Sequence, residues 1–245
     1  MMNPVIDMLY ARKSVRAYED TEIAPEIKQA ILESAVQAPS AGNMTLYTIL
    51  DITDQELKDK LAVTCDNQPF IAKAKMVLVF CADYRRWYDV FCKYIDPVRV
   101  PAEGDMLLAQ QDTLVAAQTT VIAAESFGIG SCYIGDILEN YETHQKLLNL
   151  PKYVIPTCMV VFGYPTEQQK TRKKPARFRV EDIVHENGYS MEKANRMDAM
   201  LMERQERTGE EFVDWLEKFC ARKWNSEFSV EMSRSGKEII DSWNK

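Results

Sequence analysis

The 245-residue sequence lacks several signatures of common catalytic sites. It has only two histidines, His144 and His185, and neither has a neighbour at a spacing typical of zinc ligands. No Gly-x-Ser-x-Gly turn is present, which counts against a Ser-His-Asp hydrolase. No Gly-x-Gly-x-x-Gly follows an expected strand, so the fingerprint of a dinucleotide-binding Rossmann domain is missing.

The chain also lacks an excess of positive charge and a long apolar run. Its net charge is −7 and its pI is about 5.1, so it does not have the basic character of a nucleic-acid-binding domain. No apolar run is long enough to span a bilayer. The first eight residues carry Asp7 and lack the basic-then-apolar order of a signal peptide. We therefore expect a cytoplasmic protein with no membrane or nucleic-acid partner.

The six cysteines form no Cys-x-x-Cys pair. Cys81, Cys132 and Cys158 lie in apolar, strand-like surroundings, where cysteine behaves as a small hydrophobic residue. We expect reduced structural thiols and neither a disulfide framework nor a metal site. The composition, 46% hydrophobic and 27% charged, is ordinary for a soluble globular protein.

Hydrophobic spacing predicts helices that alternate with strands. The expected helices cover residues 3–10, 25–37, 55–63, 84–94, 103–127 and 141–149. The expected strands cover residues 46–52, 76–82, 132–136 and 154–162. The basic segment 168–179 is expected to be a loop, residues 181–190 irregular, and residues 192–243 mostly helical.

Two of these segments are apolar enough to predict their place in the fold. The continuous apolar run 76–82 is typical of a strand that is buried on both faces. The pattern 103–127 is apolar around most of its circumference, which predicts a central helix that is buried on most sides and also contacts a partner subunit. We infer one α+β domain, with a core over 1–190 and a helical extension over 191–245.

Two separate basic clusters are present, at residues 12–16 and 172–179. Each taken alone is typical of a solvated helix end or loop. Taken together, they offer guanidinium and ammonium donors of the kind that bind phosphate. The residues by themselves leave both interpretations open.

Three short polar turns lie between the clusters, at 39–43, 66–68 and 134–136. Gly135 has no Cβ and would let the backbone approach a flat ligand closely. Asn43 and Gln68 offer amide groups of the kind that a flavin ring edge requires. A phosphorylated, planar redox cofactor would carry the chemistry itself, which would account for the lack of a visible acid–base pair.

The order of these motifs resembles one family. Residues 12–16 resemble the Arg-x-Ser-x-Arg opening of the nitroreductase family of FMN-dependent oxidoreductases, and residues 38–43 and 128–135 resemble its next two cofactor segments. Residues 175–177 and 184–189 resemble the branch of NADPH-type flavin reductases and oxygen-insensitive nitroreductases. The resemblance covers nearly the whole chain.

The resemblance implies an α-β-α sandwich with a mostly antiparallel central sheet, a long buried central helix and a C-terminal helical extension. It implies a homodimer with FMN at the interface. The implied activity is an FMN-dependent NAD(P)H oxidoreductase that passes hydride through flavin N5 in a ping-pong mechanism, with nitroaromatics, quinones or flavins as acceptors. The alternatives are another flavin reaction on the same scaffold, such as reductive dehalogenation or an oxygen-dependent reaction, and a non-enzymatic flavin-binding or interaction protein.

The resemblance also assigns cofactor-binding residues, and no catalytic side chain. Those implied for the FMN phosphate and ribityl chain are Arg12, Lys13, Ser14 and Arg16. Those implied for the flavin or its tail are Ser40 and Asn43. Those implied for the isoalloxazine ring are Gln68, Tyr133, Ile134, Gly135 and Asp136. Those implied to close on the phosphate and the pyrimidine side are Lys174 and Arg177.

The sequence departs from the family pattern at two places. Residues 44–47 (Met-Thr-Leu-Tyr) stand where many members have Gln-Pro-Trp, and 174–177 is one residue longer than the usual Lys-Pro-Arg. Residues 222–223 (Arg-Lys) are candidates for the 2′-phosphate of NADPH, and Arg234 is a further candidate for the FMN phosphate pocket.

Overall fold

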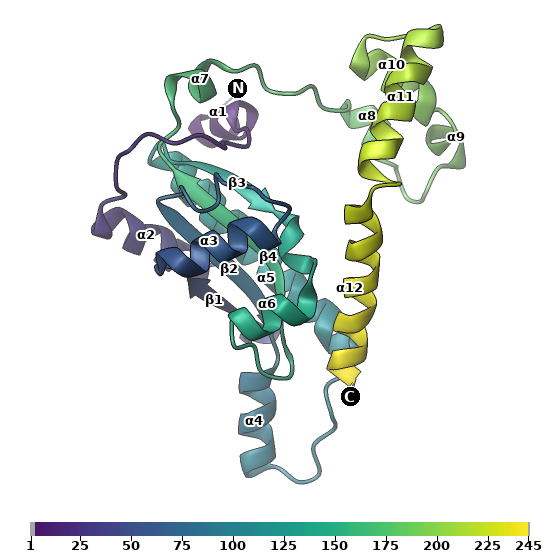
Figure 1. Cartoon of the computed structure of the whole chain (residues 1–245). Coiled ribbons are helices and arrows are strands. Elements are labelled where there is room, and N and C mark those ends of the chain that lie inside the picture. Colours follow the sequence, from purple (N-terminus) through teal and green to yellow (C-terminus); the bar gives the residue numbers. More distant parts are fainter. Residues whose placement is uncertain (1–2, 245) are drawn as a thin grey trace. The chain divides into compact units, whose positions relative to one another are not determined.

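A four-stranded antiparallel sheet forms the centre of the part of the chain, residues 3–244, that the computed structural model describes (Figure 1). The strands follow the order β1 (Tyr47–Asp51), β2 (Met76–Asp83), β4 (Val154–Gly163) and β3 (Gly130–Ile134). The two central strands, β2 and β4, are buried along their whole length. This confirms the apolar run 76–82 as a strand that is covered on both faces.

Helices cover both faces of the sheet, which confirms the predicted α-β-α sandwich. On one face, α2 (Pro25–Val36) and α5 (Glu103–Ser126) pack against alternate residues of β2 and β4. On the other face, α3 (Gln55–Thr64) and the 3₁₀ turn η2 (Gly135–Leu138) pack against the remaining residues of the same strands. Period-2 alternation along a strand sends successive side chains to opposite layers.

The central helix α5 has two distinct faces. Its buried face is rich in small residues, including Ala109, Ala116 and Ala117, which allow a close approach to the sheet. Its outer face remains apolar, with Leu107 55% exposed and Leu114 48% exposed. The long central helix is confirmed; within this chain its face toward the sheet is buried and its outer face is exposed.

The described residues form ten further helices. They are α1 (Pro4–Ala11), η1 (Ala41–Asn43), α4 (Arg85–Tyr94), α6 (Tyr141–Leu147), α7 (Glu167–Thr171), α8 (Val180–Ile183), α9 (Met191–Ala194), α10 (Met197–Gln205), α11 (Gly209–Lys223) and α12 (Glu227–Asn244). No helix in the described part has the length and hydropathy needed to cross a membrane.

Two short helices correct the sequence interpretation. The segment 168–179 was expected to be a loop, but it begins within α7, whose Gln169 is buried. The segment 181–190 was expected to be irregular, but it begins within α8. Helices of four or five residues are too short to show a 3.6-residue hydrophobic period, so the sequence has no signal for them.

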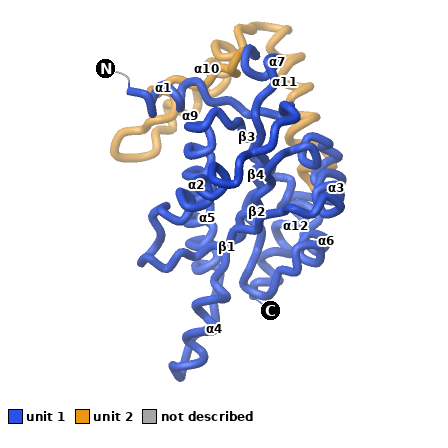
Figure 2. The backbone as a smooth tube through the Cα atoms, turned by 90° about the vertical axis from the view of Figure 1, so that its left-hand side faces the viewer, with its two compact units in different colours: residues 1–172, 231–245 blue, residues 173–230 orange. Residues whose placement is uncertain are grey.

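The chain forms two compact units, coloured separately in Figure 2. The first runs up to Arg172 and resumes at Glu231, and the second covers Lys173–Val230. The C-terminal part of α12 belongs to the first unit, where the Trp243 indole is buried and donates a hydrogen bond to Ala102 O (3.1 Å). These bounds differ from the expected division after residue 190, and the roles assigned to 1–190 and 191–245 stay predictions.

All six cysteines, which lie within the described part, are unpaired. Cys65, Cys81, Cys132 and Cys158 are buried. This agrees with the expected structural thiols.

Candidate functional site

The basic segment 12–16 lies beside the first residues of β3. Ser14 forms a parallel bridge with Ser131, and the Val15 N–H donates a hydrogen bond to Ser131 O (2.9 Å). The Val15 side chain is buried against Gly130, where a Cβ would lie only 2.5 Å from Val15 Cγ2. A glycine is therefore needed at the start of β3 for the basic segment to approach it.

Two guanidinium groups of this segment have no anionic partner among the described residues. Arg12 is half-buried, and its Nη1 donates to Ser131 Oγ at 3.4 Å. The Arg16 guanidinium lies 5.9 Å from the centre of the Phe70 ring. Neither guanidinium pairs with a carboxylate among residues 3–244. Guanidinium groups without a carboxylate partner are suited to a phosphate.

Three of the predicted phosphate residues converge on Cys132. Burial raises the pKa of this thiol, whereas the charge of Arg16, a hydrogen bond with Ser14 and the charge of Arg12 act in the opposite direction. The structure therefore brings together Arg12, Ser14 and Arg16. The sequence interpretation treated Cys132 only as a core residue.

Lys13 has a different setting from its neighbours. Its ammonium donates to Lys170 O (2.7 Å) and to Arg172 O at the end of α7. The Arg172 guanidinium donates in return to Ser14 O (2.6 Å). Lys13 thus ties the basic segment to α7, and its role near the FMN phosphate stays a prediction.

The turn after β3 is open on one side. Apart from Gly135 itself and its two chain neighbours, no described residue has an atom within 4 Å of a Cβ built on Gly135, which is exposed. Ile134 is buried and Asp136 is half-buried. The Tyr133 hydroxyl donates to Gln118 Oε1 of α5 (3.2 Å), and burial raises the pKa of this phenol. The backbone at Gly135 is exposed, and its contact with a flat ring stays a prediction.

The other predicted flavin contacts in the first unit, Gln68, Ser40 and Asn43, lie in turns. The Gln68 amide donates to Cys65 O (2.8 Å) in the turn after α3. Ser40 Oγ accepts from the Thr45 N–H (2.9 Å), and Asn43 is exposed with a φ of 57°. These bonds fit the turn chemistry of such residues, and contacts of Gln68, Ser40 and Asn43 with FMN stay predictions.

Sequence reasoning missed Asp112, which organises the loop after α2. This buried carboxylate of α5 accepts hydrogen bonds from the Ala41 N–H (3.0 Å) and the Leu46 N–H (3.3 Å). The sequence did contain a signal for it, because Asp112 is an acidic residue within the otherwise apolar helical pattern 103–127.

The segment that departs from the family pattern is held by α4. The Trp87 indole donates to Met44 O (2.6 Å), and the Arg86 guanidinium donates to Thr45 O (2.8 Å) and Tyr47 O (2.6 Å). Hydrogen bonds to these backbone carbonyls therefore help to fix residues 44–47, together with the buried side chains of Leu46 and Tyr47.

Arg234 is engaged elsewhere in the first unit. Its guanidinium forms a two-point ion pair with Glu142 (2.8 and 2.9 Å) and a second pair with Glu231 (2.8 Å). These bonds hold α12 against α6. Its charge is thereby balanced, and we drop it as a candidate for the FMN phosphate.

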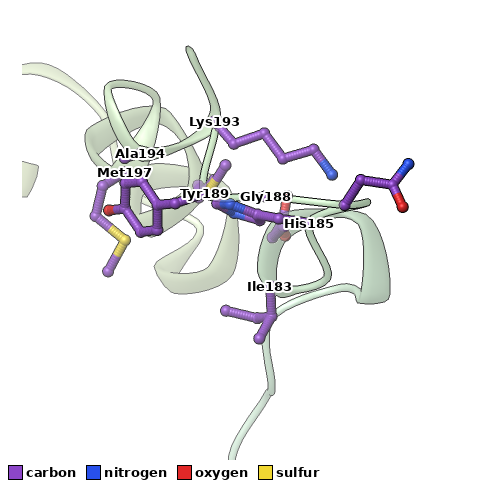
Figure 3. Close-up of a pocket in the computed structure, with 10 residues that line it drawn as sticks. Ile183, His185, Gly188, Tyr189, Lys193, Ala194 and Met197 are labelled. Atoms are coloured by element: carbon purple, nitrogen blue, oxygen red, sulfur yellow. The ribbon is translucent and has the colours of Figure 1, made fainter. Parts of the chain in front are cut away.

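Lys174 and Arg177 belong to the second unit, so their predicted closure on the phosphate stays a prediction. Arg222 and Lys223 lie in the last turn of α11. A pocket of about 640 Å³ in this unit is lined by His185, Tyr189 and Met197 among others (Figure 3). None of the predicted cofactor residues lines that pocket.

The sequence of residues 9–164 matches the nitroreductase family. The chain belongs to this family. The match includes the basic segment, β3 and η2, and it ends before Lys174 and Arg177.

Relatives support this membership. The chain is 31% identical over 188 residues to the oxygen-insensitive NADPH nitroreductase of Salmonella typhimurium, covering 77% of this chain and 75% of the relative. It is 34% identical over 190 residues, with the same coverage, to the FMN reductase [NAD(P)H] of Bacillus subtilis.

Solved structures extend the likeness over nearly the whole chain. The NfrA1 structure from B. megaterium is 28% identical, with a TM-score of 0.81, 97% of this chain covered and 98% of the other. The Vibrio harveyi NADPH:FMN oxidoreductase in complex with NAD+ is 25% identical, with a TM-score of 0.80 and the same coverage.

Proposed function

We propose that this protein is an FMN-dependent NAD(P)H oxidoreductase that reduces nitroaromatics, quinones or flavins. The observation that carries the proposal is the pair of guanidinium groups, Arg12 and Arg16, without carboxylate partners beside the start of β3. The open turn at Gly135 lies at the other end of the same strand. The four residue steps from Ser131 to Gly135 span about 14 Å, which is the length scale of a ribityl phosphate joined to a flavin ring.

The residues present fit FMN. Arg12, Ser14 and Arg16 supply fixed charge and donors for the phosphate, as their convergence on Cys132 supports. The backbone at Gly135 supplies a flat, open surface for the ring. When bound, FMN supplies the hydride chemistry, so the chain needs to bind and orient it rather than to provide a nucleophile. A phosphate contact of Lys174 and Arg177 stays a prediction of the family resemblance.

The outer face of α5 supports a homodimer with FMN at its interface. Leu107, Leu114 and Val115 are exposed there, and Leu9 and Tyr10 of α1 are exposed as well. Apolar surface of this kind is typical of faces that a partner subunit covers. We also propose a cytoplasmic location. Sedimentation should give twice the 28.2 kDa mass of one chain.

The absorbance spectrum of the purified protein tests the activity. We expect flavin bands that NADPH or NADH bleaches without oxygen and that an added acceptor restores. A colourless protein that gains no flavin bands with FMN would refute the proposal. Bound flavin that neither nicotinamide bleaches would favour another flavin reaction on this scaffold.

The NADPH-to-NADH preference follows from the same experiment. Two relatives, one in Salmonella typhimurium and one in Vibrio harveyi, have NADPH in their names. This supports NADPH as the preferred electron donor of this protein. We expect faster bleaching by NADPH, measured in a stopped-flow spectrometer. Comparing the protein with an Arg222→Ala variant then tests whether the end of α11 contributes to that preference.

A further inference from the structure

Glu139 is a buried carboxyl directly behind the turn at Gly135. The residue is only 5% exposed, and its Oε1 atom has no hydrogen-bond partner among the described residues. Its backbone N–H donates to Asp136 O (3.0 Å), which closes η2. An ionised carboxylate that is buried without donors is costly, so such a group tends to keep its proton.

The charges around Glu139 act in the same direction. Burial and the negative charges of Asp136, Asp66 and Glu231 together raise the pKa of Glu139 to about 7. These three carboxylates come from η2, from the turn after α3 and from the beginning of α12.

The remaining charged or titratable groups around this position do not compensate. His144 of α6 is buried, and burial lowers its pKa, so its imidazole is neutral at pH 7. The Arg234 guanidinium is engaged by Glu142 and Glu231. Ionisation of Glu139 would therefore place one more negative charge in a cluster for which residues 3–244 supply no unengaged cation.

Hydrogen bonds near Glu139 connect the two turns that are predicted to contact the flavin ring, namely the turn after β3 and the turn that carries Gln68. The His144 Nδ1–H donates to Ile137 O of η2 (2.9 Å), and its Nε2 lies 2.8 Å from Thr64 Oγ1 at the end of α3. The Asn140 side chain donates to Thr64 O (3.0 Å). The turn after β3 and the turn that carries Gln68 are thus joined through residues adjacent to Glu139.

We propose that Glu139 is a positioning residue of the flavin site, which holds the Gly135–Asp136 turn in its ring-binding position only while its buried carboxyl carries a proton. Loss of the proton drives the carboxylate toward water and away from Asp136, which displaces the turn and adds negative charge behind it. FMN affinity therefore falls as pH rises through neutrality. This inference rests on the proposed binding of FMN to that turn.

The test is an FMN titration of the flavin-stripped protein between pH 6 and 9, followed by quenching of flavin fluorescence. We expect the dissociation constant to rise about fivefold over this range, which is the lower end of typical couplings between linked sites. The Glu139→Gln variant, which stays neutral, should keep its pH 6 affinity throughout. The Glu33→Gln variant removes an exposed carboxylate of α2 and should behave like the parent protein.

A second variant should shift the midpoint of the pH-dependent change in FMN affinity rather than remove the pH dependence. Asp66 is exposed, so Asp66→Asn should fold normally. It removes a neighbouring negative charge, which should lower the Glu139 pKa and move the midpoint of the affinity change to lower pH. This result decides the matter even where Glu139→Gln does not fold.

The outcomes separate the two proposals. A dissociation constant that is independent of pH in the parent protein, or equally dependent on pH in Glu139→Gln, overturns the role of Glu139 while FMN binding stands. A midpoint that Asp66→Asn leaves in place overturns it as well. A protein that binds no FMN at pH 6 overturns the proposed function, and the role of Glu139 with it.

Discussion

Replacing Glu139 with glutamine should remove a pH dependence of folding stability that can be estimated from the structure. The ordinary glutamate pKa of 4.5 rises to about 7 in the folded protein. Between these values the folded chain holds a proton that the unfolded chain has lost, so the free energy of unfolding decreases as pH rises from 4.5 to 7 and then levels off. One pKa unit corresponds to about 1.4 kcal/mol, which gives a total of about 3 kcal/mol.

The assay is urea unfolding of the flavin-free parent protein and of the Glu139→Gln variant at a series of pH values from 4.5 to 8. The variant has no carboxyl at this position, so its free energy of unfolding relative to that of the parent should increase by about 3 kcal/mol across the range. The stability difference between the two proteins is the measured quantity, because contributions from titrating groups that do not interact with Glu139 cancel in it.

Two other carboxyl groups with shifted pKa values affect the stability in a different pH range. Hydrogen bonds from Arg234 lower the pKa values of Glu142 and Glu231 to about 2. Their stabilisation is present above their unfolded value of 4.5 and is lost as pH falls toward 2. A stability difference that stays constant from pH 4.5 to 8 would show that Glu139 ionises like an exposed glutamate, and the reasoning from its burial would be wrong.

Three further changes test the site and its support. Arg16→Ala should weaken FMN binding by about 10- to 100-fold in a fluorescence titration, since a charge-assisted hydrogen bond contributes about 1.5–3 kcal/mol; Lys146→Ala, on the exposed face of α6, serves as the control. Gly130→Ala should destabilise the protein by about 1–3 kcal/mol in urea unfolding because its Cβ would overlap Val15, and Val15→Ala should partly rescue it. Leu114→Glu, which puts a charge on the exposed apolar face of α5, should shift the sedimenting species toward the monomer.

The sequence predicted the elements whose hydrophobic pattern is long. The run 76–82 and the pattern 103–127 both have enough apolar residues to indicate a buried strand and a buried helix, and the structure confirms them as β2 and α5. The start of β3 was placed two residues late, at Cys132, because glycine and serine are weak strand formers. Residue 130 is a strand residue because it pairs with Gly163 of β4, which is a tertiary contact and leaves no local signal.

The supporting residues of the site were harder to predict than its motifs. Asp112 and Glu139 are acidic side chains that local pattern alone would place in solvent. Both are buried because segments distant in the sequence pack over them, including the loop after α2 for Asp112 and the beginning of α12 for Glu139. Burial of this kind depends on the assembled fold, so a motif read along the chain does not contain it.

The Arg-x-Ser-x-Arg motif has a physical reason in the structure. An extended segment sends alternate side chains to opposite sides, so Arg12, Ser14 and Arg16 share one side, where they converge on Cys132. The intervening residues serve the other side, with Val15 buried against Gly130 and Lys13 bound to carbonyls of α7. The variable positions of the motif therefore anchor the segment, and the fixed positions present donors to the phosphate in our proposal. A one-residue insertion within 12–16 would exchange the two sides, and it should abolish FMN binding even though every cation would still be present.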